Sequence, residues 1–313
     1  MRVFLPALAV LLCSVSSAAA GTVGFERGTV PDSDGKPRDI GIWYPSDAAA
    51  ASEPIGLHRQ TVAMNGGPAR RQLPLVVLLH GDQSSFANHY GTALALAEAG
   101  FVVTGVNQDM SLPERPRHVR RVLDYMLAEW PHRDRLDSSR IGVFGFSVGG
   151  FTALVALGGA PDFARIAPHC AERSDRICEV IKQRNIDTSI PVSAWVHDER
   201  IKAAVLAAPT LGFTFPAAGV AAITAPIQLW RAGRDEITAH PWNAEAIYQA
   251  LPSKPEYVVV SDAGHFAFVS CSAELAARAP VMCRDSAGFD RAGFQRTFNL
   301  AVVSFFKAKL AVP

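Results

Sequence analysis

Short apolar runs along the chain alternate with longer stretches in which apolar residues recur with helical spacing. Residues 75–79 (LVVLL) and 101–106 are continuous runs of this kind, as expected of strands buried on both faces of a parallel sheet. The strands predicted in this way cover residues 38–44, 75–79, 101–106, 140–146, 201–208, 227–230 and 256–260, and the predicted helices cover residues 85–99, 115–130, 149–157 and 295–309.

Strands that alternate with helices predict the α/β class, with a mostly parallel central sheet and helices on both faces. Right-handed crossovers bring the loops at the carboxyl ends of the strands to one edge of the sheet, so functional residues are expected there. Residues 161–199 break the alternation, because they contain no clear strand. We interpret this segment either as a cap-like insertion over the functional edge or as a surface excursion.

The first twenty residues have the pattern of a secretory signal peptide. Arg2 precedes an apolar run over residues 3–13, and three alanines at 18–20 form a small-residue cleavage site. This run is much shorter than the ~20 apolar residues that a transmembrane helix needs. A lipid anchor at Cys13 is the weaker alternative, because the preceding residue is a leucine and not a small residue. Residues 1–20 are therefore predicted to be removed on export to the periplasm or the medium.

The remaining residues, 21–313, are predicted to form one large globular domain, since 49% of the chain is hydrophobic and only 19% is charged. Removal of Arg2 reduces the 30 basic residues to 29, which equals the 29 acidic residues. A chain without a basic surplus is not expected to bind nucleic acid. No later segment is apolar enough to predict an integral membrane span.

Four cysteines remain after cleavage, and an exported protein meets an oxidising compartment. Two disulfides are therefore expected, and the pairing Cys170–Cys178 with Cys271–Cys283 is favoured because each would close a short loop. Four free buried thiols are the alternative. No Cys-x-x-Cys spacing occurs, so a zinc site is not predicted.

A nucleophile is predicted at Ser147, the centre of the motif Gly145-Phe146-Ser147-Val148-Gly149. The motif follows an apolar strand and begins an apolar helix, which is the strand–turn–helix context of a nucleophile elbow. The small flanking residues relieve clashes at the tight turn, and the backbone N–H of Val148 points toward the charge that develops on a substrate oxygen. The alternative is a glycine-rich turn with an incidental serine.

A base and an orienting acid follow in the order Ser…Asp…His that α/β-hydrolases use. Asp235 lies in the turn after the predicted strand 227–230, and His265 is the only histidine that follows the last predicted strand. Glu236 is the main alternative for the acid. Asp262 competes less well, because an acid three residues before the histidine rarely reaches its Nδ1.

A second donor to the substrate oxyanion is predicted in the turn after residues 75–79, which begins His80-Gly81-Asp82. The glycine lets the backbone pass close to the nucleophile, so the backbone N–H of Asp82 is the expected partner of the Val148 N–H. Gln83 is the alternative donor. The Asp82 carboxylate should turn toward solvent or a partner, because a negative charge beside an oxyanion is unfavourable.

Taken together, these motifs resemble exported bacterial dienelactone-hydrolase-like proteins, which are similar to the platelet-activating-factor acetylhydrolase type of α/β-hydrolase. The resemblance covers nearly all of residues 21–313 and includes IWYP at 42–45, the His80-Gly81 turn, GFSVGG at 145–150, Asp235, Gly264-His265 and the ending CSAELAARAPVMCRDSAGFDRAGF at 271–294. It implies carboxylic ester hydrolysis by Ser147, Asp235 and His265. One position departs from the pattern, since dienelactone hydrolases proper use a cysteine where this chain has Ser147.

The predicted function is a serine hydrolase that cleaves a small-molecule carboxylic ester through an acyl-enzyme intermediate. No metal or organic cofactor is expected for this chemistry. A lipid-directed acetylhydrolase or phospholipase and a peptidase or amidase would use the same three residues. A non-catalytic binding protein is the least favoured alternative, because such a protein would normally have lost one of the three.

Overall fold

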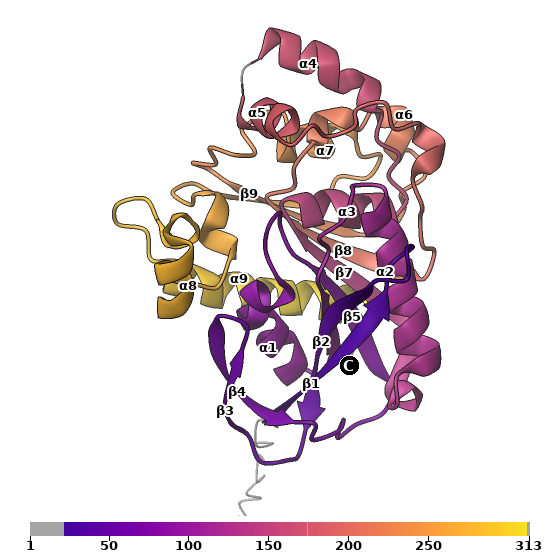
Figure 1. Cartoon of the computed structure of the whole chain (residues 1–313), viewed down its shortest axis with the longest axis vertical. Helices are drawn as coiled ribbons and strands as arrows, with labels where there is room; N and C mark the ends of the chain where they lie inside the picture. Colours follow the sequence, from indigo (N-terminus) through magenta and orange to yellow (C-terminus); the bar gives the residue numbers. More distant parts are fainter. Residues whose placement is uncertain (1–21, 174, 312–313) are drawn as a thin grey trace, which may run out of the picture.

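The computed structural model describes residues 22–173 and 175–311, and the predicted signal peptide at 1–20 lies outside these described residues (Figure 1). Ten strands in the described part form one sheet in the order β10-β9-β8-β7-β5-β6-β2-β1-β4-β3. Strands β5 to β10 pair in parallel with one another, whereas β2 joins them antiparallel through β6. The predicted α/β fold with a mostly parallel sheet is confirmed. The strands are β1 Thr22–Pro31, β2 Pro37–Ser46, β3 Ala51–Ile55, β4 His58–Met64, β5 Leu73–Leu79, β6 Val102–Val106, β7 Leu136–Phe146, β8 Ile201–Ala207, β9 Ile227–Ala232 and β10 Glu256–Val260.

Three strands near the amino terminus, β1, β3 and β4, were not predicted from the sequence. They lack a continuous apolar run, because buried and exposed positions alternate in β4 and most of β3 is exposed. Two of the buried positions of β4 are polar: the Gln60 side chain accepts a hydrogen bond from the Trp43 indole, and His58 contacts the Asn88 amide. Such partners come from distant parts of the chain, so a local hydrophobic pattern does not mark these strands.

Helices cover both faces of the sheet, as predicted. Helices α2 and α3 contact each other on one face, and α1 and α9 contact each other on the opposite face (Figure 1). Each face has its own apolar core, which includes Val122 and Phe151 on the first face and Leu96 and Phe306 on the second. The helices are α1 Tyr90–Glu98, α2 Glu114–Asp124, α3 Val148–Ala156, α4 Ile166–Glu172, α5 Arg176–Gln183, α6 Ala217–Val220, α7 Ala244–Ala250, α8 Ala273–Arg278 and α9 Arg291–Lys309.

Several predicted helix boundaries were wrong. A 3₁₀ turn, Phe86–His89, takes the place of the first part of the helix predicted at 85–99. The helix predicted at 115–130 is α2 followed by one π turn, Tyr125–Glu129. Helix α9 begins before residue 295, because the Asp290 side chain accepts a hydrogen bond from the Gly293 N–H and caps it there.

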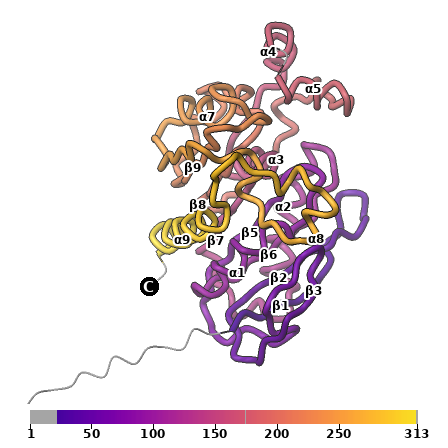
Figure 2. The backbone as a smooth tube through the Cα atoms, turned by 90° about the vertical axis from the view of Figure 1, so that its left-hand side faces the viewer, coloured from indigo at the N-terminus to yellow at the C-terminus, as the bar shows by residue number. Residues whose placement is uncertain are grey.

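The segment 161–199 contains α4 and α5, which stand at one end of the molecule, far from β1 and β3 (Figure 2). Both predicted disulfides are confirmed: Cys170–Cys178 links α4 to α5, and Cys271–Cys283 closes a loop of the carboxyl-terminal region. Among the residues that the structure describes, no helix has the length and apolar character needed to cross a membrane.

Candidate active site

Ser147 occupies the sharp turn at which β7 runs into α3, as the sequence predicts. Its φ is 55° and its ψ is −119°, a backbone conformation that residues other than glycine rarely adopt. A Cβ added at Gly145 would lie 2.2 Å from the Gly149 carbonyl oxygen, and one added at Gly149 would lie 2.2 Å from the Leu79 carbonyl oxygen. The two glycines therefore let the helix and the neighbouring strand approach the turn closely, which leaves the serine at the carboxyl edge of the sheet.

The structure brings Ser147, His265 and Asp235 together at this edge. His265 Nε2 lies 3.0 Å from Ser147 Oγ, and His265 Nδ1 lies 2.8 Å from Asp235 Oδ2. The His265 and Asp235 side chains are 4% and 2% exposed, so the contact between them is shielded from water. This geometry allows the imidazole to accept the serine proton while its other nitrogen donates to the carboxylate.

The Asp235 carboxylate is fixed by its own loop. Its Oδ1 accepts hydrogen bonds from the backbone N–H groups of Ile237 and Thr238, at 2.9 and 2.7 Å, and its Oδ2 accepts one from the Thr238 hydroxyl at 2.7 Å. Burial by itself would raise the pKa of Asp235, but the charge and hydrogen bond of His265 and the bonds from Thr238 outweigh it and hold the pKa below its ordinary value. The acid is therefore ionised at neutral pH.

The two competing acids do not contact His265. Asp262 forms an exposed ion pair with Arg234 at 2.7 Å, with both side chains more than half exposed. Glu236 is exposed to solvent. Of the three acids, only Asp235 lies in hydrogen-bond contact with the imidazole.

The turn that carries Asp82 runs beside the nucleophile. A Cβ added at Gly81 would lie 3.5 Å from Ser147 Cβ and 3.0 Å from the Phe146 ring, so this turn passes next to the serine. Asp82 and Val148 both line the cavity that contains Ser147, whereas the alternative donor Gln83 lines only the neighbouring cavity. The Asp82 carboxylate turns away to Arg184, as the sequence argument requires, and their closest charged atoms are 2.6 Å apart.

Ser147 opens into a small cavity of ≈ 120 Å³ with an aliphatic lining. Much of this lining comes from segment 161–199. The apolar residues around the cavity are Leu112, Val148, Ile177, Val180, Ile181, Ile186, Leu211 and Ile237. The cavity is therefore suited to a short aliphatic group.

A second cavity of ≈ 790 Å³ adjoins the first and is more polar. The two cavities share Asp82, Leu112, Val148, Arg184 and Ile186, so the Arg184–Asp82 ion pair lies at their common boundary. Neither Ser147 nor His265 lines the larger cavity.

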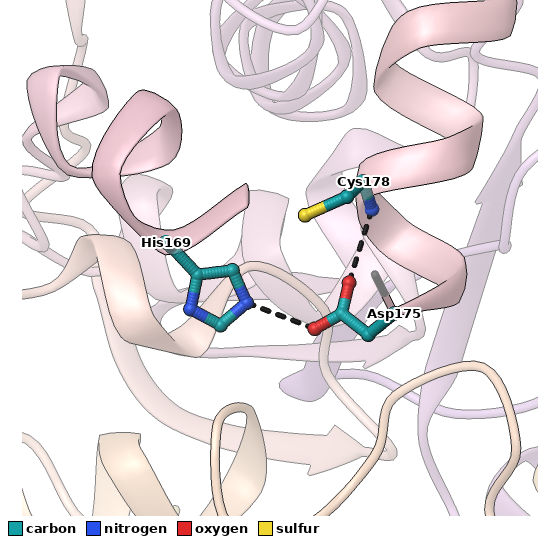
Figure 3. Close-up of side chains that lie close together, drawn as sticks. All are labelled: His169, Asp175 and Cys178. Carbon is teal, nitrogen blue, oxygen red and sulfur yellow. Dashed lines mark hydrogen bonds and ion pairs between the residues drawn. The ribbon is translucent and has the colours of Figure 1, made fainter. Parts of the chain in front are cut away.

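One group of potential metal ligands occurs in the described residues, formed by His169, Asp175 and Cys178 (Figure 3). Its sulfur is bonded to Cys170 and therefore lacks the thiolate charge that binds metals. Asp175 caps α5 through the Cys178 N–H and pairs with His169 Nε2 at 2.8 Å, while the His169 ring stacks on Phe213. This group joins α4, α5 and the body of the protein, and with its sulfur in a disulfide it offers a metal only the His169 and Asp175 side chains.

Sequence reasoning missed Arg115, which lies 3% exposed beneath the turn of His80 and donates to the His80 carbonyl oxygen at 2.8 Å. A signal for it exists in the sequence. Arg115 shares a helix face with Val119 and Val122, so a charge stands on the stripe that the helix buries.

Comparison with known proteins finds relatives that are named as ester hydrolases. The chain is 24% identical over 255 residues to a bis(hydroxyethyl) terephthalate hydrolase of Streptomyces coelicolor, a match that covers 80% of this chain and 69% of that protein. It is 32% identical over 130 residues to the cutinase est1 of Thermobifida alba, which covers 38% of this chain and 42% of the cutinase.

Among solved structures, a ferulic acid esterase from Streptomyces cinnamoneus has the same fold. It superposes with a TM-score of 0.65 over 96% of this chain and 93% of the esterase, at 19% identity. No protein-family profile matches the chain.

Proposed function

We propose that the protein is a serine hydrolase that cleaves carboxylic esters. The observation that carries this proposal is the hydrogen-bonded series Ser147–His265–Asp235, whose serine lines the aliphatic cavity. The relatives named as hydrolases of esters support the same reaction class.

In the proposed mechanism, His265 Nε2 takes the proton of Ser147 as the serine oxygen attacks the ester carbonyl carbon. The buried Asp235 carboxylate stabilises the imidazolium and holds its Nδ1–H in place. The N–H groups of Val148 and Asp82 bind the oxyanion. The imidazolium then protonates the leaving alcohol, and a water molecule, deprotonated by His265, releases the acid and frees Ser147.

The shape of the site supports an ester with a short aliphatic acyl group. A cavity of about 150 Å³ holds benzene with its six carbon atoms, so a volume of ≈ 120 Å³ has room for roughly five non-hydrogen atoms. We place acetyl to butyryl groups in this cavity and a larger, more polar alcohol in the adjoining one. Residues 161–199 act in this proposal as a cap, because Ile177, Val180 and Ile181 form one wall of the acyl cavity.

We also propose two finer assignments, a closer relation to the family named in the sequence analysis and export from the cell. The resemblance to dienelactone-hydrolase-like and platelet-activating-factor acetylhydrolase-like proteins agrees with a small acyl cavity. Two disulfides are typical of an oxidising compartment, which supports export to the periplasm or the medium.

The test is a series of nitrophenyl esters of increasing acyl length, from acetate to octanoate, measured on the wild type, Ser147→Ala and Ser253→Ala. The last variant is a matched control, because Ser253 is exposed and lines neither of the two cavities. We expect the highest kcat/KM on acetate or butyrate, and a loss of turnover of about 10⁴- to 10⁶-fold in Ser147→Ala alone. Full activity of Ser147→Ala would overturn the assignment.

Two further measurements separate the alternatives. A fluorophosphonate probe that labels the wild type but not Ser147→Ala excludes a non-catalytic binding protein. Faster turnover of a matched nitroanilide than of the ester would favour an amidase, and a maximum at octanoate would favour a lipid substrate.

A further inference from the structure

Arg115 is a buried cation whose hydrogen-bond partners are neutral. Its guanidinium donates to the Thr152 hydroxyl at 3.1 Å, to the Gln108 carbonyl oxygen at 2.7 Å and to the His80 carbonyl oxygen at 2.8 Å. Burial lowers the pKa of Arg115 to about 10, while the carboxylates of Asp82 and Asp109 act in the opposite direction, so the group stays charged at neutral pH. Burying a cation without a contacting carboxylate is costly, which calls for a functional explanation.

Two of these hydrogen bonds hold the turn that carries the Asp82 N–H. Arg115 binds the His80 carbonyl oxygen directly and also fixes Gln108, whose N–H donates to His80 Nε2 at 3.0 Å. His80 Nδ1–H in turn donates to the Gly81 carbonyl oxygen. The Gly81 C=O and the Asp82 N–H belong to one planar peptide group, so orienting the carbonyl also orients the N–H.

The third hydrogen bond holds the first turn of α3, which carries the Val148 N–H. Thr152 Oγ1 accepts from Arg115 Nε at 3.1 Å and donates to the Val148 carbonyl oxygen at 2.8 Å. Thr152 is fully buried, so water does not compete for these bonds. One guanidinium therefore connects the two segments whose N–H groups face the reacting oxygen in the proposed mechanism.

We propose that Arg115 is a positioning residue that sets the distance and orientation of the two oxyanion donors, Asp82 N–H and Val148 N–H. Its positive charge lies beneath these donors and adds to the electrostatic stabilisation of the oxyanion. The inference rests on the proposed function, because an oxyanion forms only if Ser147 attacks an ester. It predicts that loss of Arg115 weakens binding of the transition state more than binding of the substrate.

The test compares Arg115→Met with Arg120→Met, a matched control on the exposed face of the same helix. For each variant we measure kcat and KM on nitrophenyl butyrate, the inhibition constant of an alkylboronic acid that forms a tetrahedral adduct with Ser147, and the thermal midpoint. In Arg115→Met, kcat should fall by about 10- to 100-fold and the boronate should bind more weakly by a similar factor, with KM within threefold of the wild type. Arg115→Lys should recover part of kcat, and Arg120→Met should behave as the wild type.

A second variant keeps the inference testable if Arg115→Met does not fold. Thr152→Val removes the link to Val148 at nearly constant volume and should lower kcat and boronate affinity together by several-fold. A folded Arg115→Met with wild-type kcat, or a loss of kcat without a loss of boronate affinity, would overturn the role of Arg115. If Arg115→Met does not fold, a wild-type kcat in Thr152→Val would also overturn the role of Arg115. A wild-type protein that hydrolyses no nitrophenyl ester would instead overturn the proposed function, and the inference with it.

Discussion

The disulfide Cys170–Cys178 allows the role of α5 in acyl selectivity to be tested without changing any residue that lines the small cavity. It joins α4 to α5 across a sequence separation of 8. The loop-closure relation gives about 2.5 kcal/mol for a loop of this size, which shifts an equilibrium by roughly 70-fold. Because the loop lies within segment 161–199, this energy should be lost mainly from the docking of α5 and not from the sheet.

The double variant Cys170→Ser/Cys178→Ser should therefore accept longer acyl chains, because Ile177, Val180 and Ile181 no longer hold a fixed wall. The assay is kcat/KM on nitrophenyl butyrate and octanoate, and we expect the butyrate preference to shrink at least several-fold while Ser147 still reacts with a fluorophosphonate.

The matched control is Cys271→Ser/Cys283→Ser, which removes a disulfide of sequence separation 12, worth about 2.8 kcal/mol by the same relation. Neither of these cysteines lines the cavity of Ser147, so this variant should lose stability but keep the acyl-length profile. The reasoning is refuted if both double variants change the profile equally, or if neither does.

Two further predictions concern the acid of the site and the acid sensitivity of the fold. Asp235→Asn should lower kcat by about 10⁴-fold with little change in the thermal midpoint, because an amide favours the wrong imidazole tautomer of His265; more than a tenth of wild-type activity would contradict this. Burial lowers the pKa of His80 from 6.5 to about 3. Between these two pH values, His80 is therefore protonated in the unfolded chain and neutral in the native protein. The contribution of the neutral His80 ring to the free energy of unfolding should be complete above pH 6.5 and should fall by up to about 5 kcal/mol as the pH approaches 3. Equal free energies of urea unfolding at pH 7 and pH 4.5 would be the contrary result.

The positions of Ser147, Asp235 and His265 could be predicted because each lies within five residues after the end of a predicted strand. The strands are recognisable from local hydrophobicity, and parallel pairing brings their carboxyl ends to one edge whatever the connecting segments contain. The same reasoning reached the Asp82 turn. It also anticipated that the Asp82 carboxylate would turn toward solvent or a partner, although it did not identify Arg184 as that partner.

The parts that escaped prediction depend on contacts between distant segments. Arg115 is buried because three acceptors converge on it from the turn after β5, the loop after β6 and helix α3. Its place on the buried stripe of α2 marks it in the sequence, but the helix sequence does not show which groups accept its hydrogen bonds. Strands β3 and β4 pair at the edge of the sheet with few apolar residues of their own. The cavity wall that α5 forms beside Ser147 likewise depends on how segment 161–199 packs against the sheet. The spacing of apolar residues in that segment does not determine this packing.

The ion pair between Arg184 and Asp82 has a consequence for how substrates of different size are admitted. Its side chains are 37% and 49% exposed, and an exposed pair of this kind contributes at most about 1 kcal/mol. A substrate that must occupy both cavities at once therefore loses no more than about fivefold in affinity by parting the two charges. Ionic strength lowers this barrier further, so discrimination against bulky esters should be sharpest in dilute buffer and relax in concentrated salt.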